Sequence, residues 1–171
     1  MGMHFPRLTL ASFALVIGLL GICVLQPISP AHAQQSRVDE LEQVLANSSD
    51  SDSARLAILL QLAEAYLYVT PLDSIDIARD AQELAARTED TESAARALLS
   101  LGRAQQFLGN FSDDLDPLLQ AYSKAMVVND ESLIASVLRN MGTHYYGIGQ
   151  FNQSLAHLLE ALSFAERGPQ A

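Results

Sequence analysis

The chain has 171 residues, of which twenty are acidic and ten are basic, so its formal net charge at pH 7 is −10. This charge repels DNA and RNA, and the basic residues form no continuous stripe, so we expect no nucleic-acid partner. Cys23 is the only cysteine, which excludes disulfide bonds within the chain.

The first 33 residues have the pattern of a secretory signal peptide. Arg7 precedes an almost wholly apolar run over residues 8–25, and the segment ends in the small-x-small motif Ala31-His32-Ala33. We expect cleavage after Ala33 and a periplasmic or secreted mature chain. The alternative is an uncleaved anchor in the inner membrane with the chain facing the periplasm, because about eighteen apolar residues can just span a bilayer.

Residues 34–52 are predicted to be a leader that contains one short helix. Val38, Leu41, Val44 and Leu45 follow helical spacing. The Ser- and Asp-rich run that follows them indicates a loop.

Apolar spacing from residue 53 onwards predicts three helix pairs, over 53–87, 91–127 and 130–167. Residues 168–171 form a short tail after the third pair.

The ends of these helices carry recognisable signals. Gly109 and Gly149 separate the helices of the second and third pairs, and we expect both in the left-handed conformation that glycine adopts cheaply. Asp50, Asp90 and Asp130 precede the pairs and are expected at helix starts.

Pro117 conflicts with a regular helix in the second half of the second pair. Inside a helix it removes a backbone hydrogen bond and costs about 3 kcal/mol. We expect a helix from Phe111 with a local distortion at Pro117; the alternative is a shorter helix that starts at Pro117 and is capped by Asp116.

A block of sequence recurs every forty residues, which is typical of stacked helical repeats. The block and its second copy consist of Leu98, Gly102, Gly109, Phe111, Leu115, Leu118, Leu119, Ala121 and Ala125, followed by Leu138, Gly142, Gly149, Phe151, Leu155, Leu158, Leu159, Ala161 and Ala165. A fainter earlier copy contains Leu59, Leu62, Ala63, Ala81 and Ala85.

These framework residues resemble the tetratricopeptide repeat. The pairs Leu101-Gly102 and Met141-Gly142, together with Ala121 and Ala161, match the small and large positions of that family. The resemblance implies an all-α, right-handed superhelix of about three antiparallel helix pairs over residues 53–167. The forty-residue period is longer than usual for the family and resembles exported sensor regions that precede histidine kinase or diguanylate cyclase modules.

The chain stops directly after the third pair, whose last helix would expose an apolar face. This face is expected either to pack on another copy or to continue into a longer protein, and we favour the second interpretation.

No cluster of residues predicts an enzyme, a cofactor or a metal site. His144 and His157, with Glu160 as the only further ligand nearby, are interpreted as ordinary surface or groove residues. Asp113, Asp114 and Asp116 lack the spacing of a calcium loop and are interpreted as a solvated helix start.

In the family that the chain resembles, the first helix of each pair lines a concave groove. The positions implied in the second and third repeats are Arg96, Leu99, Arg103, Gln106, Arg139, Asn140, Thr143 and Tyr146, and those in the first are Leu60, Glu64 and Leu67. If Arg96, Arg103 and Arg139 share one face, they can hold a peptide carboxylate or acidic side chains. The alternative is that these arginines only pair with nearby acidic residues.

We therefore expect a non-enzymatic module of the bacterial envelope that binds a protein or peptide segment, as the N-terminal sensing region of a signal-transduction protein. The alternative is a free-standing scaffold or assembly factor that self-associates through its final helix pair. Contact with a membrane is expected only through residues 1–33, if they are not cleaved.

Overall fold

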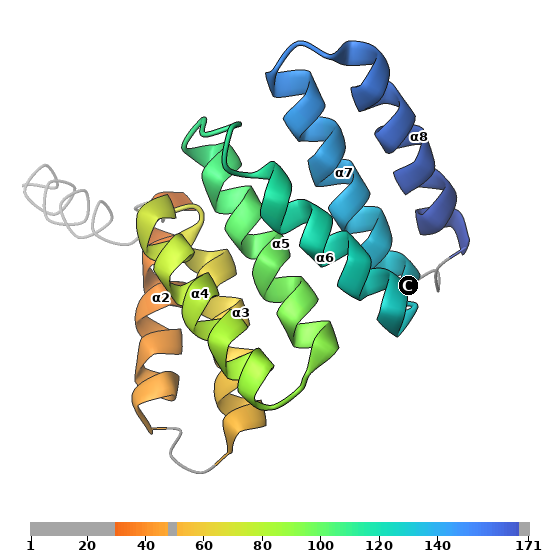
Figure 1. Cartoon of the computed structure of the whole chain (residues 1–171). Helices are drawn as coiled ribbons and strands as arrows, with labels where there is room; N and C mark the ends of the chain where they lie inside the picture. Colours follow the sequence, from red (N-terminus) through yellow and green to blue (C-terminus); the bar gives the residue numbers. More distant parts are fainter. Residues whose placement is uncertain (1–29, 48–50, 168–171) are drawn as a thin grey trace, which may run out of the picture. The chain divides into compact units, whose positions relative to one another are not determined.

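The computed structural model describes residues 30–47 and 51–167, and every regular element in this part of the chain is a helix. The protein is therefore all-α, as the sequence predicts. The helices, labelled as in Figure 1, are α2 (Pro30–Asn47), α3 (Asp52–Tyr66), α4 (Pro71–Arg87), α5 (Thr91–Phe107), α6 (Leu115–Val128), α7 (Glu131–Gly147) and α8 (Phe151–Arg167).

Most of the predicted signal peptide and the tail at 168–171 lie outside the described residues. The end of the predicted signal, Ala31-His32-Ala33, falls in the first turn of α2. No helix in the described part is long and apolar enough to cross a bilayer, and the apolar run over 8–25 does not belong to that part.

The predicted helix ends are confirmed at the later pairs. The carboxylate of Asp90 accepts a 3.0 Å hydrogen bond from the Ser93 amide, and that of Asp130 accepts one of the same length from the Leu133 amide. Gly109 and Gly149 have φ values of 74° and 78°, in the left-handed region where glycine carries no side-chain penalty. Asp50 lies outside the described residues, and Ser51 caps α3.

Helix α6 starts later than predicted. Residues 110–114 form a turn, and the helix begins at Leu115 rather than at Phe111. Pro117 is its third residue, in the first turn, where the backbone N–H groups have no partner within the helix. The proline therefore removes no hydrogen bond, so the predicted distortion is wrong. The alternative start at Pro117 is wrong as well.

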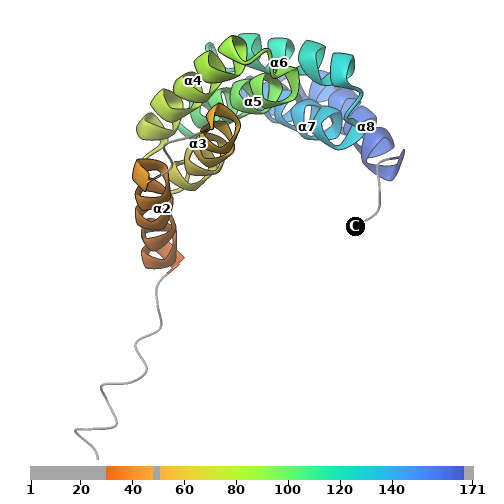
Figure 2. The ribbon, with the colours of Figure 1, turned by 90° about the horizontal axis from the view of Figure 1, so that it is seen from below.

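The helices form two layers. Each helix from α3 to α7 packs on the helix that follows it, and α5 also contacts both α3 and α7. Figure 2 shows α3, α5 and α7 along one side of the array and α4 and α6 along the opposite side. The layer of α3, α5 and α7 presents a continuous surface built from alternate helices.

Two glycines forty residues apart allow the two helices of a pair to approach each other equally closely. A Cβ atom added to Gly102 would lie 2.7 Å from the Leu118 side chain, and one added to Gly142 would lie 2.8 Å from that of Leu158. Contacts this short exclude a larger residue unless the leucine moves. Pairs α5/α6 and α7/α8 thus repeat the same packing.

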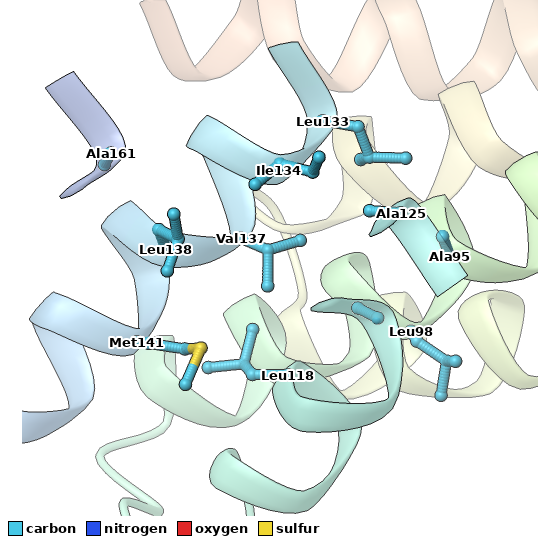
Figure 3. Close-up of a cluster of buried hydrophobic side chains, with 11 residues drawn as sticks. Ala95, Leu98, Leu118, Ala125, Leu133, Ile134, Val137, Leu138, Met141 and Ala161 are labelled. Atoms are coloured by element: carbon cyan, nitrogen blue, oxygen red, sulfur yellow. The ribbon is translucent and has the colours of Figure 1, made fainter. Parts of the chain in front are cut away.

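The largest buried cluster joins α5, α6 and α7, and Ala161 of α8 also belongs to it (Figure 3). Leu98 and Leu118 meet Val137 and Leu138 there, and each of these side chains is at most 2% exposed. Full burial of one such side chain stabilises the fold by about 1.5–3 kcal/mol. Helix α2 joins the array through Val38, which packs with Leu62 of α3 in a separate cluster.

Candidate partner-binding groove

A hollow of about 670 Å³ opens on the side formed by α3, α5 and α7, and α2 contributes to one wall. Four arginines line it: Arg37 from α2, Arg96 and Arg103 from α5, and Arg139 from α7. Glu64 is the only acidic residue in its lining. We call this hollow the arginine groove.

Arg103 is held in place by groups from α3 and from the turn that follows it. Its guanidinium forms an ion pair with the Glu64 carboxylate and lies 3.4 Å from the Tyr68 hydroxyl, to which it donates. The Arg103 side chain is only 19% exposed, so water screens the pair less than it screens a surface pair. This pair joins α3 to α5 within the lining of the groove.

Arg96 connects α5 to the start of α7. Its Nη2 donates to Glu92 Oε1 at 2.8 Å and to Asp130 Oδ2 at 3.0 Å. Asp130 is also the cap of α7, so one carboxylate serves both the helix start and the ion pair. The Arg96 side chain is 46% exposed and remains open to a ligand.

Arg139 differs from the other groove arginines. Its side chain is exposed, and its guanidinium has no hydrogen bond or ion pair with any residue in the described part of the chain. Arg37, by comparison, bonds Glu40 and Gln61, each at 3.0 Å. Arg139 is therefore the groove cation with no internal carboxylate to displace.

Apolar and hydroxyl groups line the groove together with these charges. Leu60 and Leu99 are partly buried, and Leu133 is 3% exposed. Ser100, Ser132 and Ser136 add hydroxyl groups to the lining. A surface of this kind suits a segment that carries both apolar and acidic side chains.

The structure divides the predicted groove residues into two sets. Arg96, Leu99, Arg103 and Arg139 line the arginine groove, together with Leu60 and Glu64. Gln106, Asn140, Thr143 and Tyr146 are not in its lining, and Leu67 is 1% exposed and belongs to the core. Gln106 and Asn140 form hydrogen bonds in the interior of the protein. Tyr146 is 67% exposed and meets the Phe151 ring edge-on.

Gln106 belongs to a buried polar network that ties α5, α6 and α7 together. Its Nε2 donates to Asp114 Oδ2 and to the Asn140 carbonyl, both at 2.8 Å. The other carboxylate oxygen, Asp114 Oδ1, lies 2.7 Å from His144 Nδ1. Asp114 is fully buried and His144 is 4% exposed, so each needs these partners to offset the loss of water.

Two interpretations from the sequence are wrong at this network. His144 is buried rather than on the surface or in the groove, and Asp114 starts α6 without being solvated. His157 stacks on the Tyr145 ring with 5.1 Å between the ring centroids. In the described part of the chain, no group of three or more His, Cys, Asp or Glu side chains is arranged to hold a metal ion.

Sequence reasoning missed Arg37 and Tyr68 as groove residues. Arg37 lies on α2, before the first repeat, and Tyr68 lies in the turn after α3 and is not one of the framework residues. Arg37 directly precedes the buried Val38, so the helical spacing of the leader was a signal for its place beside α3.

No protein-family model matches the chain, and no curated protein does.

Proposed function

We propose that the protein is a non-enzymatic module that binds an acidic segment of a protein or peptide in the arginine groove. The observation that carries this proposal is the concentration of four arginines, against one glutamate, around one hollow of a chain whose net charge is −10. A ligand meets the local field of the surface it approaches rather than the total charge.

The groove arginines have different parts in this proposal. Arg139 offers a free guanidinium, which can hold a carboxylate by two parallel hydrogen bonds. Arg103 is positioned beforehand by Glu64 and Tyr68, so little side-chain freedom is lost when a ligand binds. Leu60 and Leu99 supply apolar contact in the same groove.

The wider setting of the proposal comes from the sequence. The framework residues resemble the tetratricopeptide repeat, and residues 1–33 have the pattern of an export signal. We propose a superhelical repeat module in the bacterial envelope that acts as the sensing region of a signal-transduction protein.

The test is a binding titration with a labelled octapeptide of alternating Glu and Leu, compared with the same peptide carrying Lys for Glu. We expect the Glu peptide to bind and Arg139→Glu to weaken it about tenfold or more, because one charge-assisted pair is replaced by a repulsion. The matched control is Arg79→Glu, an equal change of charge at an exposed arginine outside the groove. Equal loss in both variants, or equal affinity for the Lys peptide, contradicts the groove assignment.

A further inference from the structure

A second groove lies between α7 and α8, with a volume of about 420 Å³. Its walls are mainly small and apolar, with Arg139 at one side: Ser132, Ala135, Ser136, Arg139, Leu158, Ala161, Leu162 and Ala165. Helix α8 packs mainly on α7. We call this the α7/α8 groove.

The residues forty positions earlier in the chain indicate what kind of ligand fits this groove. Forty positions earlier, the same eight places are on α5 and α6: Glu92, Ala95, Arg96, Leu99, Leu118, Ala121, Tyr122 and Ala125. The Gly102–Leu118 and Gly142–Leu158 approaches agree within 0.1 Å (2.7 and 2.8 Å), so the two helix pairs have matching geometry. The α7/α8 groove is therefore a second copy of a surface that the protein already uses.

The first copy of the surface is filled and the second is open. On α5 and α6, Leu118 is fully buried beneath α7, whose Leu133, Val137 and Met141 point into the cluster (Figure 3). These three side chains are spaced i, i+4, i+8 along one stripe of a helix. The corresponding Leu158 is 41% exposed and Leu162 is 55% exposed.

The two copies differ at four of these eight positions, and one of the differences places a positive charge in the α7/α8 groove. Leu99 of the filled surface is replaced by Arg139, whose guanidinium is free of partners in the described part of the chain. Leu99 shares the arginine groove with Ser132 and Ser136 of the covering helix. An acidic residue at the Ser136 position of a covering helix would be placed to pair with Arg139.

We propose that the α7/α8 groove binds an amphipathic helix of a partner protein, with apolar residues at i, i+4 and i+8 and an acidic residue at i+3. A helix bound there would pack on α7 and α8 in the way that α7 packs on α5 and α6. A second copy of this chain cannot offer its own α7, because Leu133 and Val137 are buried in its core.

The probe is a helix-stabilised peptide of residues 130–147 that carries Ser136→Glu, with a Ser136→Lys peptide for comparison. We expect the Glu peptide to bind the full chain, and Leu162→Glu to weaken binding about tenfold or more, because it places a charge on the apolar wall. Leu159→Glu is the matched control: Leu159 is an equally exposed leucine of α8, at 58%, but does not line the groove. Its affinity should stay within about twofold of the parent protein.

Arg139→Glu should reverse the preference between the two peptides, by about threefold in favour of Lys. Failure of the stabilised Glu peptide to bind overturns the proposal, as does equal loss in Leu159→Glu and Leu162→Glu. Sedimentation gives an independent readout. A dimer that Leu162→Glu dissociates and that excludes the peptide would identify a second copy as the occupant, and the partner-helix proposal would then be wrong.

Discussion

At the scale of single residues, the most informative side chain is Asp114, because a fully buried carboxylate is costly without partners. It meets His144 from α7 and Gln106 from α5 at the point where α6 begins. The repeat framework cannot predict this network, because neither Asp114 nor His144 recurs forty residues away. The counterpart of Asp114 is Ser154, and that of His144 is Ala104.

Replacing Asp114 with Ala should lower the free energy of unfolding by about 3 kcal/mol, because it leaves His144 and Gln106 buried without their acceptor. Urea unfolding followed by circular dichroism measures this change. Asp113→Ala is the matched control, since Asp113 is exposed and should change stability by less than about 0.5 kcal/mol. Similar losses in the two variants would show that the network does not stabilise the fold.

At the scale of helices, most boundaries were predictable because their signals are local. The carboxylates of Asp90 and Asp130 accept hydrogen bonds from backbone amides that are left free at a helix start. Gly109 and Gly149 adopt the left-handed conformation that ends a helix. The start of α6 was not predictable from the repeat. Phe111 and Leu115 match framework positions of the next copy, but that match gives their place in the array and not their backbone conformation.

The cap of α5 makes stability depend on pH. Hydrogen bonds from the Ser93 amide and hydroxyl lower the pKa of Asp90 below its ordinary value of about 3.9. A carboxylate with a lowered pKa in the folded state contributes its full stability above the ordinary pKa, and that contribution is lost as the pH falls through the folded value.

We expect Asp90→Ala to reduce the free energy of unfolding by about 1 kcal/mol at pH 7, and by less at pH 3 and below. Asp90→Asn is the control, because it keeps the capping oxygen but cannot ionise. It should retain most of the stability at pH 7. If the deficit of Asp90→Ala is the same across the whole pH range, the charge of Asp90 contributes nothing to the cap.

At the scale of the whole molecule, packing alternate helices side by side turns separate sequence positions into one surface. The resemblance to the tetratricopeptide repeat implied that Arg96, Arg103 and Arg139 could share a face, and all three line the arginine groove. It could not predict Arg37, which lies on a helix outside the repeat. It also could not separate Arg139, which is free in the described part of the chain, from Arg96 and Arg103, which are paired.

The two proposed sites meet at Arg139, which lines both the arginine groove and the α7/α8 groove. A change at this residue alone therefore cannot distinguish them. Leu162 lines only the α7/α8 groove and Arg103 lines only the arginine groove, so variants at these two positions separate the sites.

The central claim is that the arginine groove binds an acidic segment. The most direct measurement is a titration of ¹⁵N-labelled protein with the Glu/Leu octapeptide, followed through the arginine Nε–H signals in NMR spectra. We predict saturable shifts of the Arg139 and Arg103 signals, while the signal of Arg79 outside the groove stays in place. No shift at Arg139 and Arg103, or an equal shift at Arg79, would contradict the account.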